Sequence, residues 1–417
     1  MAAARVSRAL ERYGGKGPAI SSDWDSWAHE RVAAIEQADR WRRLNPLGSA
    51  GPVFIDGAGS RLVSFASNDY LGLASHPAVV TAAVTALERF GAGATSSRLI
   101  VGDRTVHHDL EDHLAAWRGT QAALVFPTGY QANLAVLSTL GAGARIVSDE
   151  LNHASIIDGA RLSRAEVRVY RHGDVDHARA MMAGAPGRVL VVTDSVFSMD
   201  GDVAPLGDLS LLCAEQRALL VVDDAHAVLP LPELDPGALS LRVGTLSKTL
   251  GSQGGYVTGP RRWMDLLVNL GRSFIFTTGL APAAAAAALA GIEVVRSDEG
   301  ATLLSRLRAN IDRVADGHPS PIVPVVLGEE AAALAASARL RDHGFLVPAI
   351  RPPTVAVGSS RLRVSLSAVH DERDVEALGQ ALAALGGERG GDEAAPTTFP
   401  DRVSSDRVSS VPRSGSL

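Results

Sequence analysis

The sequence predicts an α/β protein with a mainly parallel central sheet wrapped by helices, followed by a smaller α+β domain. Short apolar runs recur between residues 122 and 244, and helical patterns such as LSLLCAEQR separate most of them. The runs are continuously apolar rather than alternating, so we expect both faces of these strands to be buried. Intervening helices are the crossovers that parallel strands require. The strand candidates are AALVF (122–126), ARIVS (144–148), EVRVY (166–170), RVLVVTD (188–194), ALLVVD (218–223) and LSLRVG (239–244).

Four regions are expected along the chain. They are an N-terminal helix and hairpin segment (1–60), a large ligand-binding domain (61–295), a C-terminal α+β domain (296–386) and a disordered tail (387–417). The helix is predicted from Ser22 to Leu44, with arginines gathered at its C-terminal end, and the hairpin in PVFIDGAGSRLVSFA. The tail carries a tandem DRVSS repeat and almost no large apolar residues, a composition typical of disorder.

The α+β domain is expected to alternate helices with short strands. Its predicted elements are helices at 301–315 and 329–343, strands at 321–327, 345–351 and 361–367, and a helix from Glu372 to about Leu385. The preceding region repeats strands linked by helical crossovers, and this region does not. We therefore expect it to form an α+β domain of its own.

Composition and charge narrow the class of protein. Hydrophobic residues make up 46% and charged residues 21%, as in soluble globular chains. The formal charge of −6 favours neither nucleic acid nor an anionic membrane as partner. The single cysteine, Cys213, excludes an internal disulfide framework and fits a reducing cytoplasm. The N-terminus lacks the apolar core of a signal peptide, and LAPAAAAAALAGIEVV (280–295) is too short to span a bilayer, so we expect a buried helix there and a cytoplasmic protein.

Residues able to bind a ligand follow five of the predicted strands. In doubly wound sheets, ligands bind beyond the carboxyl ends of the strands. The candidates are Gly129 and Tyr130 after 122–126, His153 after 144–148, Ser198 after 188–194, Asp223 and His226 at the end of 218–223, and Lys248 after 239–244. Each residue taken singly has an alternative without a ligand. Asp223 could cap a helix, and His153 and His226 could be hydrogen-bonded structural histidines. The glycines near Lys248 could form a tight turn. Together they predict one ligand site.

The ligand that these groups fit is pyridoxal 5′-phosphate. This cofactor needs a lysine amine for its aldehyde, an acid for its ring nitrogen and donors for its phosphate. Lys248 would form the Schiff base, and Asp223 would keep the pyridine nitrogen protonated. Backbone N–H groups of Gly129 and Tyr130 at a helix start, with the hydroxyl of Thr245, would bind the phosphate. No metal site is expected.

A set of motifs carries a family resemblance over roughly residues 25 to 385. The motifs are SNDYLGL (67–73), GAGATSSRLIVGDRTVHHDLEDHLA (91–115), TGYQAN (128–133), NHASIIDG (152–159), VFSMDGD (196–202), VDDAHA (222–227) and GTLSKTLGSQGG (244–255). With them the chain resembles the α-oxoamine synthases. These are fold-type I pyridoxal-phosphate enzymes that join an amino acid to an acyl thioester with loss of carbon dioxide.

The resemblance implies further roles around the cofactor. His153 would stack over the ring and help to handle protons at the reacting centre, and Ser198 and His226 would hydrogen-bond the phenolic oxygen. Relatives are homodimers with sites at the subunit interface, which implies that Thr277 contacts the phosphate bound by the neighbouring subunit.

Substrate-binding residues also follow from the resemblance. Arg363 would clamp the amino acid's carboxylate, a task suited to a guanidinium; the alternative is an exposed strand residue. Asn68 and Thr354 would belong to the substrate site. Arg42, in the RWRR run, would meet the acyl donor, or would be a solvated charge at a helix end.

One segment favours a particular branch of the family. AIRPPTV (349–355) followed by SRLRVSLSA (360–368) is most similar to the biotin-pathway members, which implies condensation of L-alanine with pimeloyl-CoA or a pimeloyl carrier protein. The alternatives are a synthase using glycine or serine with another acyl-CoA, a catalytically silent scaffold subunit, or an aldolase-like lysine enzyme without cofactor. The chain departs from the family after VDDAH, where AVLPLPELDPGALS is shorter than usual, so we expect an altered wall of the acyl-donor channel.

Overall fold

The computed structural model describes residues 23–38, 40–42, 44, 46–48, 51–55 and 59–387. The chain divides into two compact units, Met1–Leu47 and Gly48–Leu417. In the first unit the described helix is α2 (Asp23–Gln37), so the predicted extension to Leu44 is wrong. Most helix stability comes from packing an apolar face, and α2 has no buried residue to stabilise further turns. The tail predicted from 387 lies outside the described residues from 388 onward.

The second unit is organised around a seven-stranded sheet in the order β3-β9-β8-β7-β6-β4-β5. The strands are β3 (Ala122–Phe126), β4 (Arg145–Asp149), β5 (Glu166–Tyr170), β6 (Val189–Asp194), β7 (Leu219–Asp223), β8 (Ser240–Thr245) and β9 (Gly255–Gly259). Six run parallel, and β9 is antiparallel to both its neighbours, β3 and β8. The mainly parallel sheet predicted from the sequence is confirmed.

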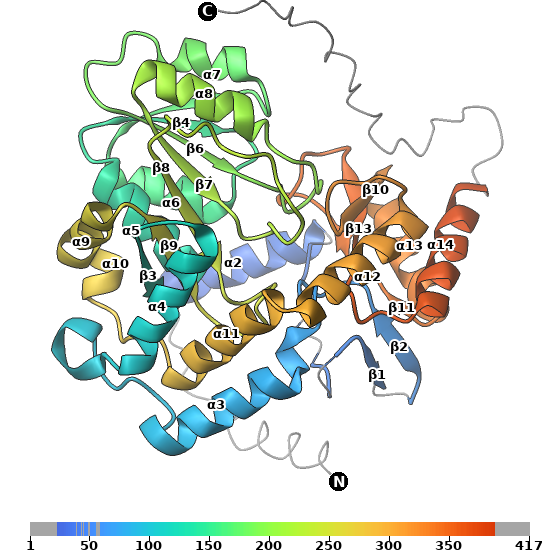
Figure 1. The fold of residues 1–417 in the computed structure, drawn as a ribbon. Helices are drawn as coiled ribbons and strands as arrows, with labels where there is room; N and C mark the ends of the chain where they lie inside the picture. The colour runs from blue at the N-terminus through green and yellow to red at the C-terminus, as the bar shows by residue number, and fades with distance from the viewer. Residues whose placement is uncertain are drawn as a thin grey trace, which may run out of the picture. The chain divides into compact units, whose positions relative to one another are not determined.

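Helices cover both faces of this sheet (Figure 1). Alternate strand residues belong to different core clusters. Leu190 and Val192 of β6 join the cluster with α5 (Gly129–Leu140), α6 (Ala154–Ser163), α9 (Arg261–Leu270) and α10 (Arg272–Ile275). Val191 between them faces α7 (Val175–Met182) and α8 (Leu206–Gln216). On that second face, β3 and β9 pack on α4 (Thr105–Arg118) and α11 (Pro282–Val295). Burial on both sides explains the continuously apolar strands. The burial predicted for 166–170 is wrong, because β5 is an edge strand and four of its five residues are exposed.

A second core joins residues from both ends of the unit. Its antiparallel sheet has the order β10-β13-β12, from β10 (Ile322–Gly328), β12 (Ala349–Ile350) and β13 (Ser360–Ser365). The hairpin of β1 (Val53–Ile55) and β2 (Arg61–Ser64) adds β11 (Phe345–Leu346) in parallel. The remaining elements are α3 (Pro77–Phe90), α12 (Asp298–Val314), α13 (Glu330–Asp342), α14 (Glu372–Gly387) and the short helical turns Leu73–Ser75 and Arg98–Gly102.

Side chains from both ends of the second unit form this core. Phe65, Leu71, Leu307 and Leu362 belong to one buried cluster, so the segment after the hairpin packs with the C-terminal elements. The hairpin, the predicted C-terminal helices and the strands near 321–327 and 361–367 are confirmed, and the domain bounds at 60, 295 and 386 stay predictions. The single strand predicted at 345–351 is wrong, because the chain forms two short strands there, β11 and β12, which pair with different sheets. No helix in the described part of the chain is long and apolar enough to cross a membrane.

The loop between β6 and α8 connects the two cores. The Arg363 guanidinium of β13 donates from Nε to the carbonyl oxygen of Ser198, and Arg361 pairs with the carboxylate of Asp200. Gly201 has a φ of +72°, and a Cβ atom there would lie 2.0 Å from the carbonyl oxygen of Ile322 in β10. Only glycine allows the loop to approach β10 this closely.

Gly201→Ala should therefore destabilise the fold by about 3 kcal/mol or more, since it adds a steric overlap to an unfavourable left-handed conformation. Gly173→Ala is the matched control: its φ is +66°, but no atom lies within 4 Å of the added Cβ. That variant should lose only about 1 kcal/mol. Chemical denaturation measures the loss in free energy of unfolding for both variants. Equal losses would show that the contact with β10 contributes no stability.

Candidate active site

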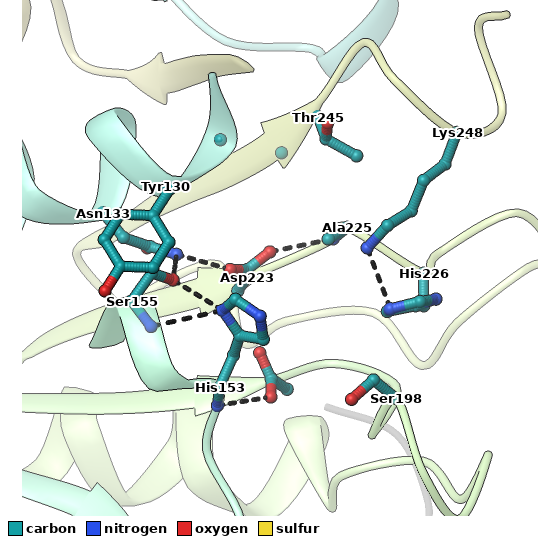
Figure 2. Close-up of a pocket in the computed structure, with 13 residues that line it drawn as sticks. Tyr130, Asn133, His153, Ser155, Ser198, Asp223, Ala225, His226, Thr245 and Lys248 are labelled. Atoms are coloured by element: carbon teal, nitrogen blue, oxygen red, sulfur yellow. Dashed lines mark hydrogen bonds between the residues drawn. The ribbon is translucent and has the colours of Figure 1, made fainter. Parts of the chain in front are cut away.

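A cavity of about 220 Å³ lies at the carboxyl ends of the parallel strands. Its lining residues are Gly129, Tyr130, Asn133, His153, Ser155, Asp194, Ser198, Asp223, Ala225, His226, Gly244, Thr245 and Lys248. The structure thus brings together the eight candidates that the sequence placed at strand ends or beside the lysine. Figure 2 shows the side chains of Lys248 and Asp223 directed toward the same space.

Lys248 is held by a compact loop after β8. The hydroxyl of Thr245 donates to the carbonyl oxygen of Gly254 at 3.0 Å and accepts from the backbone N–H of Ser247 at 3.1 Å. The Lys248 amine, Nζ, lies 2.8 Å from Nε2 of His226. Burial lowers the pKa of Lys248 to about 8, although Asp223 and Asp194 act to raise it. A neutral amine, the nucleophilic form, is therefore accessible near physiological pH.

Asp223 ends β7 and is held by two donors. Its Oδ2 accepts from Nδ2 of Asn133 at 2.6 Å, and its Oδ1 accepts from the backbone N–H of Ala225 at 2.9 Å. Burial raises the pKa of Asp223, while the Asn133 hydrogen bond and the charge of Lys248 oppose that rise. The carboxylate is thus fixed in direction and faces a cation across the cavity.

Asp194 places a second carboxyl group beside Asp223. The two residues end the neighbouring strands β6 and β7 and pair in register. Oδ2 of Asp194 accepts from the backbone N–H of His153 at 3.0 Å. Burial, and then the neighbouring charge of Asp223, raise the pKa of Asp194 well above its usual range. Burial thus favours the protonated form of Asp194 beside the Asp223 carboxylate.

His153 caps helix α6 and has a defined protonation pattern. Its Nδ1 accepts from the backbone N–H of Ser155 at 3.2 Å and lies 2.8 Å from the Ser155 hydroxyl. A backbone N–H only donates, so the proton of the neutral ring is on Nε2. Burial lowers the pKa of His153, which favours this neutral form. The ring therefore offers an N–H donor.

The start of α5 also lines the cavity, through Gly129 and Tyr130. Thr128 caps this helix by accepting from the backbone N–H of Gln131 at 3.1 Å. The first N–H groups of a helix have no partner within it, so those at Gly129 and Tyr130 suit an anion. A Cβ atom at Gly255 in β9 would lie 2.4 Å from the backbone nitrogen of Gly129. Glycine in β9 therefore lets the helix start reach this position.

The other predicted residues lie outside the residues that line this cavity. Arg363 is 5% exposed, which excludes the alternative of an exposed strand residue. Its Nη1 donates to the Ser365 hydroxyl at 2.7 Å and its Nη2 to Oδ1 of Asn68 at 3.2 Å. Thr354 is exposed in the turn before β13.

Thr277 and Arg42 have different settings. The Thr277 hydroxyl accepts from Nε2 of Gln131 at 3.3 Å, at the start of α5. Arg42 is exposed in the N-terminal unit, and it lies beyond the end of α2 rather than in its last turn. The predicted roles of both residues stay predictions.

Sequence reasoning missed four polar side chains that the structure connects to the site. They are Tyr70, Asn133, Ser155 and Asp194. Asn133 follows Gly129 by one helical turn, and Asp194 ends a predicted strand, so both carried a usable signal. Tyr70 carried none, because its contact with His226 spans 156 positions of the chain.

The residues present fit pyridoxal phosphate. One cavity holds an amine with a lowered pKa, a fixed carboxylate and a helix start, which are the groups that the aldehyde, the ring nitrogen and the phosphate require. Within the described residues no cluster suited to a metal ion occurs. The donor set therefore supports the cofactor predicted from the sequence.

Comparisons with known proteins agree with this chemistry. The family model for aminotransferase class I and II matches residues 60–382. The 8-amino-7-oxononanoate synthase of Anaeromyxobacter dehalogenans is 47% identical over 86% of this chain and 95% of its own length. The enzyme of the same name from Methylobacterium nodulans is 46% identical over 88% of this chain and 98% of its own.

Solved structures show the same likeness. A serine palmitoyltransferase from S. paucimobilis with bound PLP has a TM-score of 0.80 at 28% identity, covering 88% of this chain and 98% of that one. An 8-amino-7-oxononanoate synthase from Francisella tularensis has a TM-score of 0.65 at 26% identity, covering 78% and 97%. Fold and site thus define a pyridoxal-phosphate-dependent enzyme of fold type I. The chain belongs to the aminotransferase class I and II family and, within it, to the α-oxoamine synthases.

A histidine outside the cavity supports the loop that carries Ser198. His172 bridges Oδ1 of Asp149 at 3.0 Å and Oδ2 of Asp202 at 2.8 Å, and its ring meets Phe197 edge to face. Burial alone would lower the pKa of His172, but the hydrogen bonds to Asp149 and Asp202 outweigh it and raise the pKa to about 10. The protonated imidazole therefore joins the end of β4 to the loop.

Because this pKa is raised above the unfolded value of about 6.5, the contribution to stability is full below pH 6.5 and is lost as pH rises through 10. The stability difference between the wild type and His172→Gln should accordingly be largest near pH 6 and shrink toward pH 10. Asp202→Asn should give a smaller loss with the same pH trend. Urea denaturation at several pH values measures this, and a difference that stays constant with pH would contradict it.

Proposed function

We propose that the protein condenses L-alanine with a pimeloyl thioester, carried by CoA or a carrier protein, to give 8-amino-7-oxononanoate and carbon dioxide. The observation that carries this proposal is the pairing of Lys248 and Asp223 in one cavity of a chain 45–47% identical to relatives of that name. The product belongs to biotin biosynthesis. A single cysteine and the absence of a membrane-spanning helix among the described residues support a cytoplasmic location.

Each cofactor contact is assigned to a residue of the cavity. Lys248 would bind the aldehyde, Asp223 the ring nitrogen, and the start of α5 with Thr245 the phosphate. When bound, pyridoxal phosphate supplies an electron sink for the negative charge that develops at the amino acid's Cα. Ser198 and His226 would hydrogen-bond the phenolic oxygen, and His153 would lie against the ring face.

The protein's own groups would handle the proton and the carboxylate. Lys248 has a pKa of about 8 because of burial, so a fraction of its amine is neutral near pH 7 and can accept the Cα proton. His153, protonated at Nε2, would act as a hydrogen-bond donor to the reacting amino acid. The buried guanidinium of Arg363 would bind the amino acid's carboxylate, with Asn68 beside it.

Other activities fit less well. Serine palmitoyltransferase structures have high TM-scores, which favours a serine-dependent synthase as the second candidate. A silent scaffold subunit would have no use for the lysine, carboxylate and histidine gathered in the cavity.

The shortened segment after His226 packs against the protein interior. Val228 and Leu229 contact one hydrophobic core, and Leu231 and Leu234 contact another.

Growth of a strain that lacks this synthase, in medium without biotin, tests the proposal. The gene for this chain should restore growth, whereas Lys248→Ala should not, and the purified variant should lose turnover together with the visible absorbance of the lysine-bound cofactor. Assays with alanine, glycine and serine and several acyl thioesters would separate the candidates. Turnover retained by Lys248→Ala would disprove the assignment of the lysine.

We further propose a homodimer, supported by an apolar surface beside Thr277. Leu99, Ile100 and Val101 are 50%, 74% and 65% exposed, and Phe276 is 71% exposed. The segments are adjacent, because the backbone N–H of Gly279 donates to the carbonyl oxygen of Ser96 at 2.9 Å. A contiguous exposed apolar patch is typical of a subunit interface.

Ile100→Asp should weaken this dimer by placing a charge in the apolar patch. Sedimentation velocity should show the wild type at twice the mass of one chain and the variant shifted toward a monomer. Leu162→Asp, which changes an equally apolar residue 63% exposed on α6, is the control and should remain dimeric. A monomeric wild type would contradict the proposal.

A further inference from the structure

A line of hydrogen bonds leads from Lys248 into the protein interior. Nζ of Lys248 lies 2.8 Å from Nε2 of His226, and Nδ1 of the same imidazole lies 2.6 Å from the hydroxyl of Tyr70. The Tyr70 hydroxyl lies 3.2 Å from Oδ1 of Asn68, which also accepts from Nη2 of Arg363. Tyr70 is fully buried. One chain of contacts therefore joins the lysine to the arginine expected to bind the substrate carboxylate.

The two ends of this line restrict how its protons can be arranged. A guanidinium only donates, so the Asn68 atom that faces Arg363 is the amide oxygen, which only accepts. The Tyr70 hydroxyl has a single hydrogen and two acceptors within reach, Nδ1 of His226 and Oδ1 of Asn68. It can donate to only one of them at a time.

Two complete arrangements follow. When Lys248 is neutral, Tyr70 donates to Nδ1, and the Nε2–H of His226 donates to the lone pair of Nζ. When Lys248 is an ammonium, it donates to Nε2, the imidazole proton is on Nδ1 and donates to the tyrosine oxygen, and Tyr70 donates to Asn68. The second arrangement holds one more proton, on Nζ, and one imidazole proton has moved from Nε2 to Nδ1.

The surroundings keep the imidazole neutral in both arrangements. Burial, followed by the charges of Lys248, Arg363 and His153, lowers the pKa of His226 well below its usual value. Lys248 itself faces Asp223 and Asp194 as well as Arg363, and burial brings its pKa to about 8. His226 thus carries a single proton near neutral pH, while Lys248 interconverts between its two forms.

We propose that Tyr70 is a positioning residue that determines which nitrogen of His226 carries the proton, and that Asn68 is the second acceptor that lets the chain reverse when Lys248 gains a proton. The inference rests on the proposed function for its consequence, because there His226 meets the phenolic oxygen of the cofactor. An oxygen anion can only accept a hydrogen bond, so the imidazole nitrogen that faces it must carry a proton. Donation from Tyr70 to Nδ1 supplies the required Nε2–H.

Histidine ¹⁵N NMR on the full-length protein, loaded with pyridoxal phosphate and after its removal, tests the arrangement directly. His226→Gln identifies the resonance. In the cofactor-free wild type we expect Nε2–H above the titration of Lys248 and Nδ1–H below it. In the loaded protein we expect Nε2–H throughout. Nδ1–H in the cofactor-free wild type above that titration would overturn the proposal without any variant of Tyr70.

Tyr70→Phe removes the hydroxyl and almost no volume. It should leave a mixture of His226 tautomers, lower the apparent pKa of Lys248 by about one unit in the cofactor-free protein, and weaken pyridoxal phosphate binding about tenfold. Tyr170→Phe is the matched control, since Tyr170 is equally buried on β5 and does not line the cavity. It should leave all three measurements unchanged.

Unchanged tautomers and an unchanged lysine titration in Tyr70→Phe would overturn the proposal. If Tyr70→Phe fails to fold, the pH series on the wild type still decides the matter. Failure of the proposed condensation would be a separate result, because the cofactor-free NMR measurement does not depend on which amino acid or acyl thioester is used.

Discussion

The site depends on keeping an amine and a carboxylate together in one cavity at the end of the sheet. Asp223 is buried and Lys248 is half-buried, and the pKa shift of each comes first from burial and is opposed in part by the other's charge. Burial of an unpaired charge costs several kcal/mol, so removing either group leaves the other strongly unfavourable. Hydrogen bonds fix both groups in place. Asn133 and the backbone N–H of Ala225 donate to the Asp223 carboxylate, and His226 contacts the Lys248 amine.

Sheet topology explains how these groups reach one place. Because β6, β7 and β8 are parallel neighbours, the residues at their carboxyl ends share one edge, and Asp194, Asp223 and the Lys248 loop follow from three consecutive strands. β9 then returns antiparallel between β8 and β3, and its glycine permits the start of α5 to come close. The same packing that buries the sheet on both faces therefore builds the cation, the acid and the anion-binding helix start.

Much of this arrangement was predictable from sequence. The parallel strands were predicted because continuous apolar runs need burial on both sides, and the site because Asp223 and Lys248 lie at strand ends. β9 was missed because two of its five residues, Gly255 and Gly259, are glycines, which local preference disfavours in strands. The end of α2 was misplaced because the arginines taken to mark its C-terminal end lie beyond the last turn, and α2 has no buried residue to stabilise further turns. Tyr70 was beyond reach, since its contact with His226 spans 156 positions and leaves no local pattern.

The hydrogen bonds that Arg363 already makes bear on which molecules it could bind. Its guanidinium already donates to three uncharged oxygens, those of Ser198, Ser365 and Asn68. An incoming group must outcompete these acceptors rather than fill an open position. A hydrogen bond to an ionised acceptor is about twice as strong as one to a neutral oxygen, so a carboxylate can displace them whereas an ester or amide gains little. If Arg363 binds the substrate carboxylate as proposed, its existing hydrogen bonds would favour free acids over their neutral derivatives.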